Sequence, residues 1–564
     1  MRNLSIQLRH FGILAALVSL TAAACSDSEY DPEAPAIDPN APRIHITSPA
    51  RGTFAHDVSS ILVQGIATDD SGVVSSVTVN GIPAVVEANG NFSATVPVDA
   101  GTMLLHAIAK DAQNNTGKET RAVVVGPLEP ISSTVPQAIT ASMTAQTFDA
   151  LGRGLTGYLT GGNLQALVAP MNPVVDAGTT NGVPDCLYAQ ARITSTNLGG
   201  NSKISFAPQP GGIWLQAELD HPNIGAHLQW AVACLDGSRD VMIGASHITI
   251  SGMVTVGIKN GAFDIHFDNP NVNITGFNVE LGGVPGSIVD MLHLDTMLGP
   301  VLGFVAEKFA VPYLNTSLAG LNTVKTIDVL GTKVDVKVTP ARIDFDVTGA
   351  TIELDSKLRA QGDTSSPGFV YLTDDPPAMD MNQGFQLAVV DNAVNQLLGS
   401  YWAAKGMNVG LDLKNGSYGE VGKLFDRVEL EAKVPPFLDA HGDSLKLTVG
   451  DLLATFKNGP AIATQIALNA TVKLKVVAGA GGALRLDVGT PEIFVDVLDE
   501  NVDGANQLNN AQFEAVSSFG LSRIVAFGSG AVGAIPLPSF GGVAVQNVKV
   551  TEQTGYVVVG GSVQ

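Results

Sequence analysis

The chain has 564 residues, of which 45% are hydrophobic and only 15% are charged, and it contains 61 glycines. This composition is typical of a β-rich, turn-rich protein that works outside the cytoplasm, and the length allows several domains of roughly 150 residues each. The formal net charge of −22 argues against nucleic acid or an anionic membrane surface as an electrostatic partner.

The N-terminus has the order of an export signal. A basic and then apolar stretch at residues 2–20 precedes small residues at 21–24 and then Cys25. This order is typical of a bacterial lipoprotein, whose cysteine is lipidated and becomes the first mature residue. We expect a signal peptide at 1–24 and a lipid anchor at Cys25 in the envelope of a diderm bacterium, where Ser26 favours the outer membrane. The alternative is an ordinary signal peptide with an incidental cysteine.

The next two segments differ in composition. Residues 25–42 are acidic and rich in proline, which predicts an extended tether. Residues 43–126 contain short alternating strands separated by turn residues such as Asn80-Gly81, which predicts a β-sandwich. This segment resembles bacterial Ig-like modules, a resemblance that implies a spacer or adhesive role without chemistry of its own.

The rest of the chain repeats one order of elements. Apolar spacing predicts a helix over residues 139–159, strands over about 189–280, a central helix over 282–321, and strands from 325 onward. The central helix has few charges and a wide apolar face, and Gly299-Pro300 predicts a kink or a restart within it. The second half repeats helix, strands, helix and strands, which indicates an internal duplication of architecture. Its expected elements are a helix at 390–401, strands at 463–477 and 483–497, a helix near 511–525 and two final strands.

The C-terminal part resembles the bactericidal/permeability-increasing, lipopolysaccharide-binding and cholesteryl-ester-transfer family. The resemblance rests on Ile535-Pro536-Leu537-Pro538, on Asn547-Val548 within a strand, on the last apolar strand at Gly555–Gly561, and on the helix at Gln383–Trp402. It implies two elongated, helix-wrapped antiparallel barrels joined end to end, at 130–350 and 351–564, with apolar grooves for acyl chains. The expected fold class is therefore mostly β with long helices (α+β), behind an Ig-like sandwich.

Two departures from that family limit the resemblance. Its members that bind or attack lipopolysaccharide are cationic, whereas this chain is acidic, so lipid binding carries over but bactericidal action does not. The family's disulfide joins a strand to a helix, whereas Cys186 and Cys234 both lie in strand-like sequence. Because they are the only cysteines besides Cys25 and the compartment should be oxidising, a bridge between them is expected, with two buried thiols as the alternative.

Motifs for catalysis are absent from the sequence. There is no Gly-x-Ser-x-Gly element, no phosphate-binding loop and no metal-type histidine spacing, so the chain is expected not to be an enzyme. Asp499, Asn501 and Asp503, followed by Gly504, match the first half of a calcium loop. The bidentate acid at the twelfth position is replaced by Asn510, so a polar turn is the alternative.

The leading hypothesis is an envelope lipoprotein that binds lipid or transfers it. Its site would be an apolar cavity, lined by Leu298, Leu302 and Val305 in the first half and by Val394, Leu398 and Tyr401 in the second. The alternative is a structural or adhesive surface lipoprotein, with solid barrels and an Ig-like contact module. A hydrolase is a more distant third possibility. The periodicity of a helix does not say which of its faces meets ligand and which meets sheet.

Overall fold

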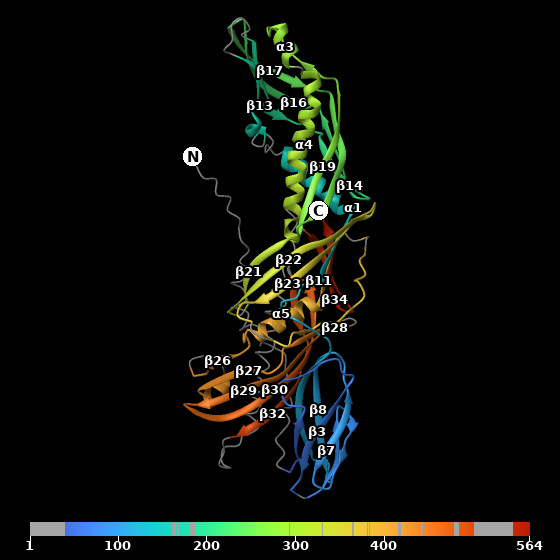
Figure 1. The fold of residues 1–564 in the computed structure, drawn as a ribbon, viewed down its shortest axis with the longest axis vertical. Coiled ribbons are helices and arrows are strands. Elements are labelled where there is room, and N and C mark those ends of the chain that lie inside the picture. The colour runs from blue at the N-terminus through green and yellow to red at the C-terminus, as the bar shows by residue number, and fades with distance from the viewer. Residues whose placement is uncertain are drawn as a thin grey trace.

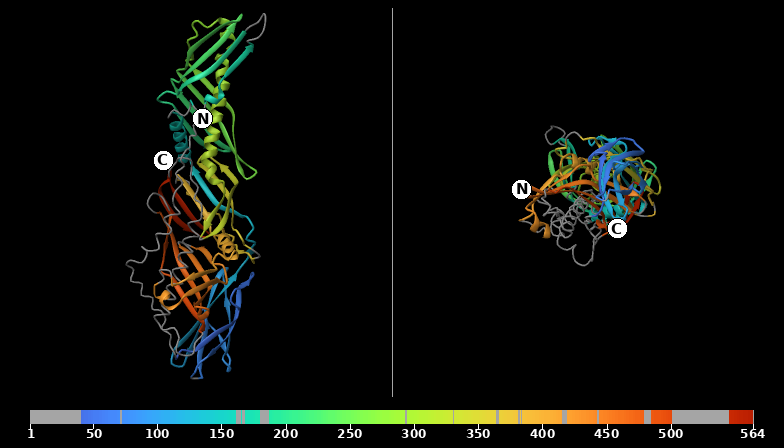
Figure 2. Two further views of the ribbon diagram at one scale, coloured as in Figure 1. Left: turned by 90° about the vertical axis from the view of Figure 1, so that its left-hand side faces the viewer. Right: turned by 90° about the horizontal axis from the view of Figure 1, so that it is seen from below.

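The structure is a computed structural model. It describes residues 40–564 except 71, 161–164, 166–167, 180–186, 293, 330, 364–365, 381, 383, 415–418, 442–443, 479–483, 501–544 and 564. The described chain is mostly β-strand, and the molecule is much longer than it is wide (Figures 1 and 2). The first half lies at one end, and the second half and the N-terminal domain lie side by side at the other (Figure 1). None of the described helices combines the length and apolarity needed to cross a membrane.

The N-terminal domain is an Ig-like sandwich of two sheets, as the sequence predicts. One sheet has the order β1 (Arg43–Ser48), β3 (Ser60–Thr68), β7 (Asn91–Pro97), β6 (Val85–Val86). The other has the order β2 (Thr53–Ala55), β9 (Thr116–Val125), β8 (Gly101–Asp111), β4 (Val74–Val79), β5 (Ile82–Pro83). Asn80 and Gly81 link β4 to β5 with φ values of 49° and 78°, the conformation for which an Asn-Gly pair is suited.

Strand β9 joins this domain to the second half. Every residue from 119 to 125 is buried, because the strand packs on both faces. Val123 and Val125 belong to the core of the sandwich. Ala122 and Val124 point the other way and pack against Val434 and Phe437 of the second half. A strand buried on both faces has a continuous apolar run, which is what residues 122–125 show.

Charged residues are buried in the same interface. Arg51 contacts Glu119 at 3.1 Å and Asp496 at 3.4 Å, and it also pairs with Asp451. Arg121 contacts Glu119 at 2.7 Å. We call these five residues the interdomain ion cluster. It links the Ig-like domain to residues about 400 positions away, where the sequence predicts a separate unit.

The segment that follows the Ig-like domain is not an open linker. Strand β10 (Leu128–Glu129) pairs with β24 (Phe369–Val370). Ile131 and Val135, which come next, are buried. Because this stretch is paired and packed, we expect it to resist proteolysis.

The first half contains two antiparallel sheets. One has the order β12 (Val175–Thr179), β13 (Leu187–Asn197), β16 (Asn223–Val232), β17 (Leu235–Gly244), β20 (Asn278–Val279), and we call it the upper sheet. The other has the order β14 (Lys203–Gln209), β15 (Gly212–Asp220), β18 (His247–Lys259), β19 (Ala262–Thr275), and we call it the lower sheet. Helices α1 (Ala145–Tyr158), α3 (Gly286–Leu292) and α4 (Leu294–Leu318) and the short turns η2 (Ala169–Met171) and η3 (Ala319–Leu321) complete this half.

A seven-stranded sheet takes strands from both halves. Its order is β21 (Thr323–Val329), β22 (Thr332–Phe345), β23 (Gly349–Ala360), β11 (Val135–Thr144), β25 (Phe385–Val390), β34 (Tyr556–Val563), β33 (Val545–Gln553). Strands β11 and β25 are antiparallel neighbours, and each runs directly into a helix, α1 or α5 (Asp391–Ala403). Residues 139–144 and 385–389, expected to be helical, are therefore strands.

The second half is built on another seven-stranded sheet. Its members are β26 (Val409–Asp412), β27 (Arg427–Ala432), β29 (Ser444–Asn458), β30 (Ala461–Ala478) and β31 (Leu484–Val488), with β28 (Phe437–His441) paired to β29 and β32 (Glu492–Glu500) paired to β30. The short helix α6 (Gly419–Leu424) lies between β26 and β27 in the chain. The expected helix at 511–525 lies outside the described residues.

Two expectations about architecture need correction. The two halves form half-barrel sheets, whereas the sequence suggested complete barrels. Long helices in both halves are not supported, because α1 has 14 residues and α5 has 13. Within the described residues α4 is the longest helix, with 25, and it continues through Gly299-Pro300 without the restart predicted there.

Candidate ligand-binding cavity

The first half encloses an apolar cavity of about 140 Å³. It lies between the upper and lower sheets, with α1 and α4 completing the wall. Its lining residues are Leu155, Leu159, Val168, Val174, Val175, Ala191, Ile193, Thr196, Asn197, Leu198, Ile204, Leu215, Ala217, Leu219, Pro222, Ile224, Ala226, Leu228, Ile243, Ile248, Ile250, Ala306, Phe309 and Ala310. None of these described lining residues has a charged or titratable side chain, and Thr196 and Asn197 are their polar members.

The space has a simple origin in the sequence. The strands alternate, so that one set of side chains on β15, β16 and β18 points into the interior between the sheets. Most of these inward residues are branched and large, but Ala191, Ala217 and Ala226 are small. Ala306 and Ala310 on α4 also line the cavity. Small side chains on facing walls leave a space that nothing fills, and an apolar space of this kind stays dry.

The structure describes only some of the side chains of the central helix, on which three lining residues were predicted. The side chains of Leu298, Leu302 and Val305 lie outside the described residues, so their lining role stays a prediction. Ala306 and Phe309, immediately beyond them on the same helix, do line the cavity. The sequence therefore indicated the correct helix but missed the small strand residues, whose signal was alanine at inward positions of an alternating strand.

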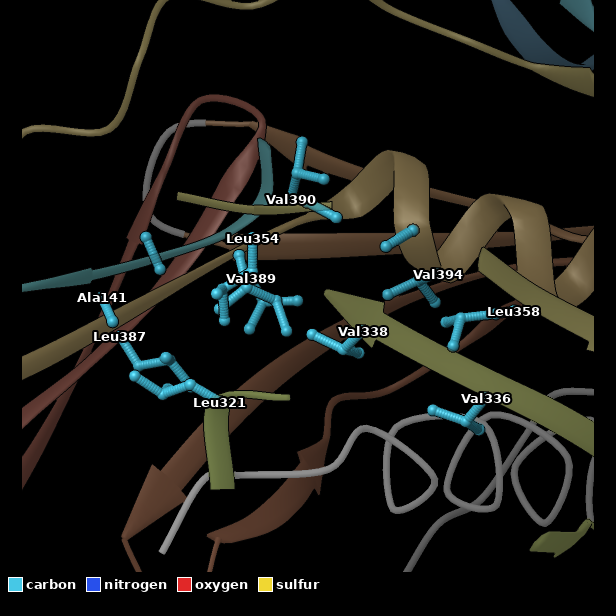
Figure 3. Close-up of a cluster of buried hydrophobic side chains, with 14 of the residues drawn as sticks. Ala141, Leu321, Val336, Val338, Leu354, Leu358, Leu387, Val389, Val390 and Val394 are labelled. Carbon is cyan, nitrogen blue, oxygen red and sulfur yellow. The ribbon is translucent and has the colours of Figure 1, made fainter. Parts of the chain in front are cut away.

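The predicted residues of the second half have a different environment. Val394, Leu398 and Tyr401 of α5 are all buried, and they pack within the main hydrophobic core. Figure 3 shows Val394 directed toward Val338 of β22 and Leu358 of β23. None of the three lines the cavity of the first half. They are thus core residues in this structure, and their role as ligand contacts has no support from it.

Helix α5 is also fixed by buried polar side chains. The Asn395 side chain accepts from the backbone N–H of Leu438 and donates to the carbonyl of the same residue, both at 2.8 Å. Gln396 accepts from the N–H of Leu358 at 2.8 Å and donates to the carbonyl of Ser133 at 2.6 Å. Because each amide pairs with the backbone of a neighbouring segment, α5 is fixed against β23, β28 and the segment before β11.

The proposed disulfide cannot be placed. Cys186 lies outside the described residues, so the bridge stays a prediction. Cys234 is exposed and lies in the turn between β16 and β17, where Ala233 and Cys234 have φ values of 48° and 62°. It is therefore a hairpin-turn residue, although the sequence suggested a strand position.

The candidate anchor and calcium residues also lie beyond what the structure describes. Cys25, Asn501 and Asp503 are outside the described residues, as is the side chain of Asp499, so lipidation and calcium binding stay predictions. Among the residues that are described, no group of three or more His, Cys, Asp or Glu side chains is arranged to hold a metal ion.

Comparisons with protein families and solved structures find similarity over parts of this chain. Residues 42–126 match the family described as glucodextranase, domain B. No curated protein sequence matches the chain. Among solved structures, a lipopolysaccharide binding protein is 14% identical with a TM-score of 0.39, covering 76% of this chain and 98% of its own. P47 of Clostridium botulinum E1 is 7% identical with a TM-score of 0.27, covering 76% of this chain and 100% of its own.

Proposed function

We propose that this protein binds the acyl chain of a lipid, or a similarly apolar molecule, in the cavity of its first half. The proposal is supported above all by the cavity itself, whose described lining is apolar except for Thr196 and Asn197 and has no titratable side chain. Moving a chain from water into such a wall is favourable by about 0.8 kcal/mol for each methylene. A polar head group would gain nothing there, so it would remain outside.

The size of the cavity sets how much ligand it takes. A dry cavity of about 150 Å³ in a protein core accepts one benzene-sized molecule. The cavity of about 140 Å³ would therefore take part of one acyl chain as it stands, and a longer chain would require the two sheets to separate. Val394, Leu398 and Tyr401 of the second half pack in the core, so this proposal places the ligand in the first half.

The proposal is tested by filling the cavity. The neutral apolar dye N-phenyl-1-naphthylamine has three aromatic rings, so its uptake, like that of a longer chain, requires the two sheets to separate. Ala226→Phe adds a ring to a lining position, so it should abolish most of this dye uptake and leave the free energy of unfolding unchanged or raised. Fluorescence titration and denaturant unfolding measure the two effects. Mass spectrometry of an organic extract of the parent protein should in addition reveal a bound lipid.

A matched control separates filling from damage. Ala454 is fully buried on β29 in the packed second half. Ala454→Phe should lower the free energy of unfolding by about 1–3 kcal/mol through overpacking while dye uptake stays near that of the parent. Equal dye uptake by parent and Ala226→Phe, or a large stability loss in Ala226→Phe, would contradict the proposal and favour a solid, structural first half.

We also propose that Cys25 anchors the protein to the outer membrane through a covalent lipid. Cys25→Ala removes the only thiol that the signal sequence presents for lipidation. The variant should leave the membrane fraction, either as soluble protein or with its signal retained, and it should lose radiolabelled fatty acid. Parent-like fractionation and unchanged labelling would contradict the anchor. Cys234→Ala is the control and should fractionate like the parent.

A further inference from the structure

The two sheets of the first half meet at a corner where the chain crosses between them four times. The crossings are the links β13–β14, β15–β16, β17–β18 and β19–β20. Neighbouring crossings are joined by a few backbone bonds. The N–H of His221 donates to the carbonyl of Ser246 at 3.1 Å, that of Ala245 to Pro222 at 3.3 Å, and that of Ser246 to Thr275 at 2.9 Å. Within the sheets the strand pairing extends over many residues, with register shifts at Ile193/Ser195 and Ser251/Met253, whereas these links are joined by single backbone bonds.

A second, smaller hollow lies at this corner. It has a volume of about 10 Å³, close to that of one water-sized probe. Its lining residues are Pro222, Ile224, Ile243, Gly244, Ala245, Ile248, Ile274 and Phe277. Four of these also line the main cavity, namely Pro222, Ile224, Ile243 and Ile248. The two hollows thus share side chains as their common wall, and side chains change rotamer far faster than a strand leaves its sheet.

Phe277 is the outermost apolar side chain of the small hollow. It is 37% exposed, whereas most other residues of this hollow are buried or half-buried, and it follows Gly276, whose φ is 62°. The strand that comes after it, β20, pairs with β17 through two residues only, Asn278 and Val279. The ring is therefore carried by a short segment with few backbone constraints, at the outer end of a row of apolar side chains that leads to the main cavity.

We propose that Phe277 is the gate of the cavity, and that an apolar chain enters and leaves between the two sheets at this corner. This inference rests on the proposed function, because a gate has meaning only for a cavity that takes up ligand. The ring closes the outer hollow, Ile224 and Ile243 form the inner wall, and displacement of these side chains opens a path that is apolar along its length. Phe277 then sets the rate of exchange, while the alanine-lined cavity sets the affinity.

The gate is tested by exchange kinetics on the full chain. N-phenyl-1-naphthylamine is loaded into the protein, and its transfer to an excess of neutral phosphatidylcholine vesicles is followed by stopped-flow fluorescence. Phe277→Ala removes most of a partly buried ring from the path, so association and dissociation should both become about tenfold faster, with the Kd changed little. Phe277→Trp should slow both rates. Leu235→Ala, at a residue 76% exposed at the start of β17, is the matched control and should exchange like the parent.

The outcomes separate the gate from the proposed function. A parent that takes up dye, with unchanged exchange rates in Phe277→Ala and Phe277→Trp, would overturn the gate and leave the cavity as the binding site. A parent that takes up no dye would overturn the proposed function and the gate together. A Phe277→Ala variant with an altered Kd but unaltered dissociation would show that the ring is a binding contact, which also overturns the gate.

Discussion

Arg51→Ala should lower the free energy of unfolding by about 3–5 kcal/mol, the range found when one partner of a buried ion pair is removed. Arg51 is the group that balances three acids of the interdomain ion cluster, Glu119, Asp451 and Asp496. Asp451 has no exposed side-chain surface and Asp496 has 8%, so water cannot replace the missing cation. Arg121 would remain as the single positive charge of the cluster.

The loss should be visible at the interface itself. Denaturant unfolding measures the free energy, and limited proteolysis should release the Ig-like domain from Arg51→Ala sooner than from the parent. Arg153→Ala is the control, because Arg153 and Asp149 form an exposed pair on α1, with more than half of each side chain in water. That variant should behave like the parent. A stability of Arg51→Ala within about 1 kcal/mol of the parent would mean that the cluster contributes little to holding the domains together.

This interface was beyond the reach of sequence reasoning. Arg51 and Asp451 are 400 positions apart, and neither has a local pattern that indicates its partner. The Ig-like sandwich, by contrast, was predictable, because strand alternation and turn chemistry are local: Asn80 and Gly81 adopt the backbone that their sequence favours. The continuous apolar run at 122–125 was the one available sign that the domain buries a second face.

The helices show where periodicity is ambiguous. Ile139 and Met143 have the spacing of a helix face, yet they lie in β11, a strand buried on both faces. When both faces are buried, apolar residues occur at nearly every position, and a helical subset can always be found among them. The same ambiguity extended the helix at α5 backward into β25. The apolar periodicity gives no reason for Asn395 and Gln396 of α5, because both side chains pair with backbone groups of distant segments.

The cavity was predictable in kind but not in detail. Helices with wide apolar faces inside curved sheets indicated unfilled space, and the first half does enclose a cavity. Its walls are mostly strand residues, and the space depends on which small residues face one another across two sheets. Ala217 and Ala226 are far from α4 in sequence, so no local window shows that they share a cavity with Ala310.

A rise in pH should loosen the interdomain ion cluster. The cluster has three acids and two arginines, so full ionisation would leave a buried negative charge without a partner. Burial raises the pKa of Asp496 to about 7, against the opposing pull of Arg51, and burial likewise raises the pKa of Asp451. The folded state therefore keeps a proton that the unfolded chain releases near the ordinary aspartate value of 3.8. The resulting stability is present in full below that value and is lost as pH rises through about 7.

Two histidines lie near the cluster, and a further aspartate elsewhere also titrates. His45 approaches Glu119 at 3.4 Å. The pKa of His106 is lowered by burial and by Lys118, so His106 favours the folded state at higher pH and opposes the trend. Asp391, at the start of α5, also has its pKa raised to about 7 by burial, and it adds to the trend from a different site. The contributions of Asp496 and Asp391 to the pH dependence of stability can be measured separately, because each residue can be replaced on its own.

Unfolding by denaturant at about pH 5 and about pH 8 measures the effect. The parent should be less stable at the higher pH, and Asp496→Asn should reduce that difference, because a neutral amide replaces the acid and can still accept from the N–H of Thr120, which lies 3.1 Å from both carboxylate oxygens. Asp391→Asn should remove a separate share of the difference without easing release of the Ig-like domain.

Asp426→Asn is the control. A hydrogen bond from Lys414 lowers the pKa of Asp426, so that carboxylate supports folding only above its ordinary value and has no part in the loss at high pH. An unchanged pH dependence in Asp496→Asn would show that all five residues of the cluster are ionised in the folded protein. The surrounding backbone N–H groups would then stabilise its excess negative charge.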